Sequence, residues 1–234
     1  MGTTRKKSAR AKVASTDRKE RLTIQKLRTE AGTFAAAQSA HVEPSLFGVT
    51  DGKAVGTYLE QKFRASLSEK YEFAPGNSAK GIDFPDLEVD LKVTSVRQPQ
   101  SSCPFDSARQ KVFGLGYSLL VFVYHKTDDA AAKAATLDIQ HAIFVEKEIT
   151  GDFQTTRGIL EILARDGNAE DLAAFISDRN LPLDEIGRDH LVKEILRTAP
   201  RQGYLTISNA LQWRLQYARV IEQAGAVEGL IRVR

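Results

Sequence analysis

Apolar and polar positions alternate strictly between residues 87 and 94, where the chain reads LEVDLKVT. A period of two predicts a β-strand with one buried face. Asp90 and Lys92 are two positions apart, so both side chains lie on the same face of this strand. A solvated edge strand is the simplest interpretation, because its polar face is charged.

Residues 52–67 show helical spacing instead. Their apolar side chains recur every three to four positions and predict one buried helix face, formed by Val55, Leu59, Phe63 and Leu67. Glu60 is next to Leu59, at the edge of that face. A further helix is predicted from Asp17 onward, with apolar positions at Leu22, Ile24 and Leu27.

The pattern after residue 100 completes an α/β order. A short helix is predicted at residues 106–113, ended by Gly114 and Gly116. Residues 117–124 are apolar almost throughout, as in a central strand that is covered on both faces. An Ala-rich linker at 128–135 leads to another predicted strand at 142–145. Residues 17–150 are therefore predicted to form an α/β core.

Helical patterns dominate residues 151–234. Helices are predicted at 157–165, 169–176, 191–196 and 208–224, and a strand at 230–233. Residues 186–234 faintly resemble a winged-helix DNA reader, with the last strand as a wing. Arg214, Gln216 and Arg219 would then face DNA. The interpretation we favour is an ordinary packed helix with a final strand, because no turn between two helices is evident.

The composition is that of a soluble globular protein. With 234 residues, of which 42% are hydrophobic and 27% charged, the chain suits one domain or one domain with an appendage. Its one cysteine, Cys103, excludes an internal disulfide and fits a reducing compartment. The longest apolar run is strand-sized, so no membrane span is predicted and a cytoplasmic location is expected.

Charge is concentrated at the N-terminus. Residues 1–30 carry ten Lys or Arg and three Asp or Glu, although the net charge of the whole chain is only +3. Residues 1–16 lack periodicity and are predicted to be a disordered basic arm. Such an arm either attracts a polyanion by releasing its counterions or serves as a solubilising tail, and the sequence leaves both interpretations open.

The charged face of the 87–94 strand suggests phosphodiester chemistry. Asp83 precedes Asp90 by seven residues, across a turn that contains Pro85. Two carboxylates bind Mg²⁺ through hard oxygen ligands, and the metal polarises a phosphoryl oxygen and lowers the pKa of a bound water. Lys92 on the same face would orient that water or stabilise the extra charge of the transition state.

Two motifs carry a family resemblance. Ile82-Asp83 followed by Asp90-Leu91-Lys92 resembles the PD-(D/E)xK nuclease signature, with isoleucine where the signature has proline. The segments GKAVGTYLE at 52–60 and IDFPDLEVDLK at 82–92 are similar to MutH-type mismatch-repair nicking enzymes and their restriction-enzyme relatives. Here Asp90 replaces the commoner glutamate of that family, and Glu88 replaces a glycine. The resemblance covers about a fifth of the chain.

The resemblance implies a restriction-endonuclease-like core, with a mixed central sheet flanked by helices, and a Mg²⁺ cofactor. It makes Glu60, Asp83 and Asp90 metal ligands and Lys92 the catalytic lysine, although Glu60 also fits a plain helix surface. Asp86 and Glu88 compete for the acidic role. Glu88 has no lysine at the required spacing, and Asp86 is too near Asp90 for a hairpin to separate them, so Asp83 is preferred.

Several polar residues are candidate DNA contacts. Arg and Gln make bidentate contacts to guanine and adenine in the major groove, and basic side chains bind phosphates. The candidates outside the C-terminal region are Lys53, Arg97, Gln98, Gln100, Ser101, Ser102, Arg109 and Lys111. An ordinary polar surface loop is the alternative for residues 97–102.

The sequence thus predicts a Mg²⁺-dependent type II restriction endonuclease that cuts duplex DNA at a specific short sequence and leaves 5′-phosphates. A homodimer is expected, because a palindromic site that is cut on both strands suits two-fold symmetry. The alternatives are a MutH-like strand-nicking enzyme and a non-catalytic DNA-binding protein of the same fold.

Overall fold

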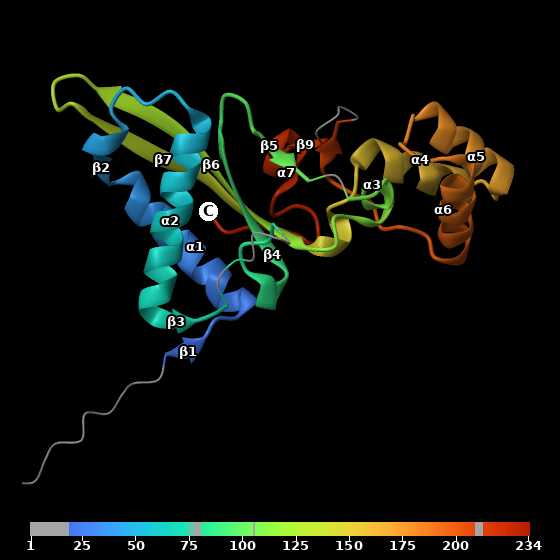
Figure 1. The fold of residues 1–234 in the computed structure, drawn as a ribbon, viewed down its shortest axis with the longest axis horizontal. Coiled ribbons are helices and arrows are strands. Elements are labelled where there is room, and N and C mark those ends of the chain that lie inside the picture. The colour runs from blue at the N-terminus through green and yellow to red at the C-terminus, as the bar shows by residue number, and fades with distance from the viewer. Residues whose placement is uncertain (1–18, 75, 77–80, 105, 209–212) are drawn as a thin grey trace, which may run out of the picture.

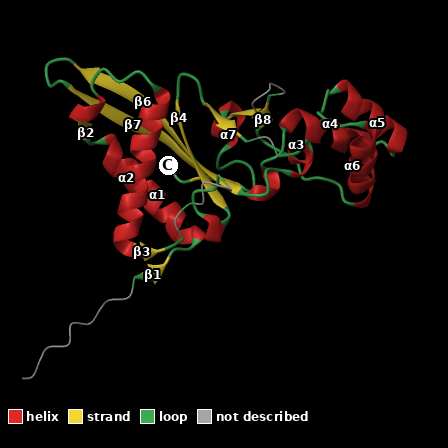
Figure 2. Cartoon of the chain, viewed as in Figure 1, coloured by secondary structure: helices red, strands yellow, loops and turns green. Residues whose placement is uncertain are grey.

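A mixed five-stranded sheet is the centre of the protein, whose computed structural model is shown in Figures 1 and 2. The structure describes residues 19–74, 76, 81–104, 106–208 and 213–234, so the predicted basic arm at 1–16 lies outside the described residues. Within these ranges the chain forms seven α-helices and several β-strands, which confirms the α/β class. No described helix is long and apolar enough to cross a membrane.

The central sheet has the order β10–β7–β6–β4. Its strands are β4 (Val89–Ser95), β6 (Ser118–Asp129), β7 (Ala134–Val145) and β10 (Leu230–Arg232). A fifth strand, β2 (Val42–Glu43), pairs with the start of β7. β4 runs parallel to β6, whereas β7 is antiparallel to β6, β10 and β2. β6 is therefore an inner strand, as its apolar sequence predicts.

Helices α1 (Ile24–Ser39) and α2 (Gly52–Lys70) cover one face of this sheet. The predicted face of α2 is confirmed, since its four apolar residues are all at most 1% exposed. They pack with Leu120, Phe122 and Tyr124, the even-numbered positions of β6. The side chains of Thr23 and Asp51 cap the N-termini of the two helices by accepting backbone N–H groups.

A smaller antiparallel sheet covers the other face. It has the order β5–β9–β8 and comprises β5 (Gln100–Cys103), β9 (Trp213–Gln216) and β8 (Thr206–Ile207). Together with α7 (Ala218–Gln223), it buries the odd-numbered positions of β6, namely Leu119, Val121 and Val123. Residues 118–124 of β6 are therefore buried on both faces.

A third core joins helices α3 (Arg109–Phe113), α4 (Phe153–Leu163), α5 (Ala169–Asp178) and α6 (Glu185–Arg197). The helices predicted at 157–165, 169–176 and 191–196 are thereby confirmed, with longer bounds. In Figure 1 this helical group lies on the right, at the opposite end of the molecule from α1 and α2. The remaining elements are short and comprise β1 (Glu20–Arg21), β3 (Tyr71–Glu72), and the 3₁₀ turns Pro44–Leu46, Pro85–Leu87 and Lys147–Ile149.

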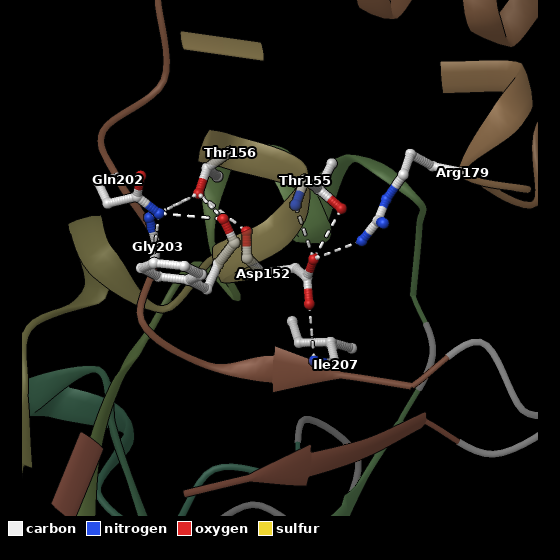
Figure 3. Close-up of polar contacts among 8 residues, drawn as sticks. Asp152, Thr155, Thr156, Arg179, Gln202, Gly203 and Ile207 are labelled. Atoms are coloured by element: carbon white, nitrogen blue, oxygen red, sulfur yellow. Dashed lines mark hydrogen bonds and ion pairs between the residues drawn. The ribbon is translucent and has the colours of Figure 1, made fainter. Parts of the chain in front are cut away.

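Asp152 ties the helical group to the smaller sheet (Figure 3). Its Oδ2 accepts hydrogen bonds from the backbone N and the Oγ1 of Thr155 at 2.9 and 2.7 Å, which caps α4. Its Oδ1 accepts from the backbone N of Ile207 in β8 at 2.8 Å, and the Arg179 guanidinium lies 3.8 Å from Oδ2. One buried carboxylate thus fixes β8 relative to α4 and α5.

The helix predicted at 208–224 is wrong for residues 213–217, and its residues 209–212 lie outside the described residues. Trp213, Leu215 and Tyr217 are buried while Arg214 and Gln216 are exposed, which is a period of two, and these residues form β9 and its end. Only the short α7 follows. The predicted last strand is confirmed as β10, but it pairs with β7 in the central sheet. The described part of 186–234 therefore does not form a winged-helix arrangement.

Two other predicted bounds also differ. The first helix begins at Ile24, preceded by the short β1, and the segment at 128–135 closes a long hairpin between β6 and β7. Alanine is compatible with either state, so the cross-strand pairing decides this segment. Two strands that follow residue 150, β9 and β10, pair with β5 and β7, which precede it. The strand pairing is therefore not divided at the expected boundary.

Replacing Phe63 tests the packing of α2 on the sheet. Phe63 is fully buried, with ring centroids 5.0 Å from Phe34 and 5.3 Å from Phe122. We expect Phe63→Ala to lower the free energy of unfolding by about 3–5 kcal/mol in urea denaturation, because it leaves a cavity. Phe47→Ala, at a side chain 39% exposed, should cost less than about 1 kcal/mol. Equal effects of the two changes would contradict this packing.

Candidate active site

Asp90 and Lys92 form a buried ion pair near the start of β4. Lys92 Nζ lies 2.7 Å from Asp90 Oδ2, and the two side chains are 16% and 3% exposed. Asp90 pairs with Leu119 and Lys92 with Val121 in the parallel register with β6. The two side chains share a face, as predicted, but that face is covered by protein, so β4 is not the solvated strand that the alternation suggested.

Asp83 is brought to the same place by a tight turn. Phe84 and Val89 exchange two backbone hydrogen bonds, of 2.9 and 3.2 Å, around the 3₁₀ turn, which folds the Asp83 segment back along the edge of β4. The backbone N of Leu91 then donates to Asp83 Oδ2 at 2.9 Å. Asp83 therefore stands beside the strand that carries Asp90 and Lys92.

Arg64 holds the other side of Asp83, a role that sequence reasoning missed. Its guanidinium NH2 donates to the Asp83 carbonyl at 2.9 Å and lies 3.2 Å from Asp83 Oδ1. Arg64 is four residues after Glu60, so both project from the same side of α2. That i, i+4 spacing was the available signal, but it does not reveal the partner.

Glu60 interacts electrostatically with this group from α2. Burial is the main cause that raises the pKa of Glu60, and the charge of Asp83 raises it further, whereas Lys92 and Arg64 act in the opposite direction. The four residues predicted to be catalytic therefore interact electrostatically with one another.

Burial also dominates the protonation of the ion pair. It raises the pKa of Asp90 to about 7, with Asp83 adding to the rise and Lys92 opposing it. For Lys92, burial acts to lower the pKa, but the Asp90 carboxylate outweighs it and the pKa is raised. A carboxyl that is costly to ionise responds strongly to an added cation.

The donor set fits a hard divalent cation. Among the described residues, Asp90 Oδ2 is buried and accepts no hydrogen bond of standard geometry, although it faces the Lys92 ammonium. No group of three or more His, Cys, Asp or Glu side chains is placed to hold a metal in the described ranges, so the three predicted carboxylates are not assembled as one cluster. Mg²⁺ commonly binds one or two carboxylates together with several waters. Asp83 and Asp90 are able to supply the two carboxylates.

A groove of about 1170 Å³ adjoins this group at Glu60, whereas Asp83, Asp90 and Lys92 are not among its lining residues. α2, the end of β4, the β4–β5 loop, β5, β9 and the end of β6 line it. Of the residues predicted to contact DNA, it is lined by Lys53, Arg97, Gln98, Gln100, Ser101, Ser102 and Arg214, and Glu60 lines it as well. Lys126 also lines it and was missed, because the strand predicted to end at 124 continues to Asp129.

The remaining predicted DNA contacts lie elsewhere or are engaged. Gln216 is exposed on β9 beside Gln100. Arg109 forms an ion pair with Glu194 at 2.7 Å, and Arg219 lies 3.7 Å from the centroid of the Phe153 ring. Lys111 is 3% exposed, so it does not reach a phosphate at the surface in this structure.

Comparison with known proteins gives the class and then the family. A family model described as "Type II restriction enzyme NspV" matches residues 21–232. The type II restriction enzyme NspV of Nostoc sp. (strain ATCC 29411 / PCC 7524) is 67% identical over 212 residues, which cover 91% of this chain and 96% of that relative. These matches define a type II restriction endonuclease, a site-specific DNA hydrolase. Within that class the chain belongs to the NspV family. No solved structure matches it.

The raised pKa of Asp90 is directly measurable. In metal-free protein carrying ¹³C-labelled aspartate, we expect one carboxyl resonance, absent from Asp90→Asn, to titrate near pH 7. Because the native pKa exceeds the unfolded value, this group's contribution to stability is fully present below about pH 4 and is lost as the pH rises to about 7. Titration of that resonance near pH 4 would contradict the burial seen here.

Proposed function

We propose that this restriction endonuclease cuts DNA at a Mg²⁺ centre of the PD-(D/E)xK type, built from Asp83, Asp90 and Lys92. One observation carries the proposal. The turn after residue 80 and strand β4 bring two carboxylates and an ammonium together, with Lys92 Nζ 2.7 Å from Asp90 Oδ2. Glu60, which interacts electrostatically with Asp83 and Lys92, lines the polar groove. The segments at 52–60 and 82–92, which resemble the MutH branch, supply α2 and β4 of this site.

Asp83 and Asp90 would hold the metal, which when bound supplies a Lewis acid at the scissile phosphate. The hydrogen bond from Leu91 N and the contacts of Arg64 orient the Asp83 carboxylate before any ligand arrives. Burial disfavours the charged form of Asp90 and raises its pKa. A cation at this carboxylate would favour the charged form and so would lower that pKa.

Lys92 would act on the reacting phosphate. Its raised pKa keeps the ammonium charged at neutral pH. With a cation held by Asp83 and Asp90, the Lys92 ammonium would stabilise the charge that develops on the phosphoryl oxygens or orient the attacking water. Glu60, at the edge of the groove, is proposed as a further acidic group in this centre.

The groove would hold the DNA backbone. Lys53 and Arg97 line it from α2 and from the β4–β5 loop, so each is able to neutralise phosphate charge along the duplex. We further propose a homodimer, in which two copies of the site cut the two strands of a palindromic sequence and leave 5′-phosphates.

Plasmid cleavage with Mg²⁺ tests the centre. We expect Asp90→Asn and Lys92→Met each to reduce cleavage by at least about 100-fold, because each removes a charge that acts on the transition state. Glu88→Gln is the matched control and should retain activity, since the exposed Glu88 pairs only with Lys147 at the surface of the described structure.

The product distinguishes the alternatives. Linear DNA with ligatable 5′-phosphate ends is expected, whereas relaxed circles alone would indicate a nicking enzyme. Cleavage that survives both substitutions would exclude this site. Specific DNA binding by the wild-type protein with no cleavage at any divalent metal concentration would favour a non-catalytic reader.

A further inference from the structure

The β5–β9 pair presents a polar face that no predicted element anticipated. Gln100 stands opposite Gln216 and Ser102 opposite Arg214 in the antiparallel register. These four side chains share the outward face, because the alternate positions Cys103, Trp213 and Leu215 are buried. We call the outward set, Gln100, Ser102, Arg214 and Gln216, the ribbon face. Three of its members also line the groove.

The inward face anchors this ribbon to the catalytic strand. Ser101 Oγ and the buried Tyr217 hydroxyl are 2.6 Å apart, so Ser101 is committed to the core. The backbone N of Gln100 donates to Thr94 Oγ1 of β4 at 3.0 Å, and Tyr217 N donates to the Pro99 carbonyl at 2.8 Å. The Asp152 bond to β8 secures the other edge of the sheet (Figure 3). The ribbon face is thus held at a set position relative to Asp90 and Lys92.

The dimensions of the ribbon suit the DNA major groove. Two paired strands are about 5 Å apart, and positions two residues apart along a strand are separated by about 7 Å. The major groove is about 12 Å wide and admits a two-stranded ribbon. A spacing of about 7 Å also matches two base-pair steps of about 3.4 Å each. In Figure 1 the β4–β5 loop rises between α2 and this ribbon. Residues of α2, of this loop and of the ribbon all line the groove.

The side chains on this face have the chemistry of base readers. The guanidinium of Arg214 forms no ion pair or hydrogen bond with any described residue, unlike those of Arg64 and Arg109. An unengaged guanidinium fork matches the O6 and N7 acceptors of guanine, and a glutamine amide matches N6 and N7 of adenine. Lys53 and Arg97, on the opposite wall and the loop, remain available for the backbone.

We propose that the ribbon face is the base-reading element of this endonuclease, with Arg214 recognising a guanine and the Gln100–Gln216 pair an adenine in the major groove. This inference rests on the proposed cutting of duplex DNA at a specific site. It assigns sequence discrimination to β5 and β9, separately from the metal centre on β4 and the turn before it.

A substitution and base-analogue cycle tests the role of Arg214. Once digestion has located the recognition sequence, each guanine in a duplex of that sequence is replaced in turn by 7-deazaguanine, which lacks the N7 acceptor but retains base pairing. We expect one replacement to lower kcat/KM of the wild-type enzyme on the order of 10-fold or more. Arg214→Ala should lower kcat/KM on the natural duplex comparably, and the same replacement should then cause no further loss.

Arg157→Ala is the matched control, since Arg157 is an exposed arginine on α4 that should leave the analogue penalty unchanged. Thermal melting checks that Arg214→Ala is folded, and Arg214→Lys, which keeps the charge without the fork, should also lose the penalty. A full penalty remaining in Arg214→Ala would overturn the assignment of Arg214. Equal loss of binding to specific and unrelated duplexes in Ca²⁺ would show a phosphate contact instead.

The adenine half is tested in the same way with 7-deazaadenine and the Gln216→Ala and Gln100→Ala variants. A penalty that persists in both variants would overturn this half. Failure of the proposed function looks different, because the wild-type enzyme would then yield no site-specific ends to map.

Discussion

The rest of the site depends on the burial of one ion pair, Asp90 with Lys92, in an edge strand. Removing two charges from water is costly, so the pair is stable only when each side chain faces the other and the strand register holds them there. A slip of β4 by one residue would turn both charges into the apolar core under α1 and α2. Only one register of β4 against β6 therefore keeps both charges out of the apolar core and next to the turn that carries Asp83.

That arrangement also links the proposed metal centre to the proposed base-reading face. β4 supplies Asp90 and Lys92 near its start and Thr94 near its end, and Thr94 accepts the hydrogen bond that begins β5. The ribbon face is thereby attached to the catalytic strand through a few hydrogen bonds and a shared apolar core. Such rigid support would keep a fixed distance between DNA bases bound at the ribbon face and the phosphate cut at Asp90 and Lys92.

The sequence predicts most of the central region for physical reasons. The hydrophobic patterns of α2, β4 and β6 are regular over many residues. Asp83, Asp90 and Lys92, which are near one another in the sequence, also lie near one another in the structure. The strand at residues 213–216 could not be predicted from the sequence, because a short alternating run is compatible with either a helix or a strand. Its pairing with β5, more than 100 residues earlier, decides between them. Arg64 was missed for a similar reason, since its partner lies across a turn. The burial of Lys111 depends on packing far along the chain.

The most direct test of the account is a crystal structure of the Lys92→Met variant bound to its recognition duplex with Ca²⁺. We expect a cation contacted by Asp83 and Asp90 beside a phosphate, with β5 and β9 in the major groove and Arg214 at a guanine edge. A cation bound away from both carboxylates, or a duplex that leaves the ribbon face in solvent, would contradict it.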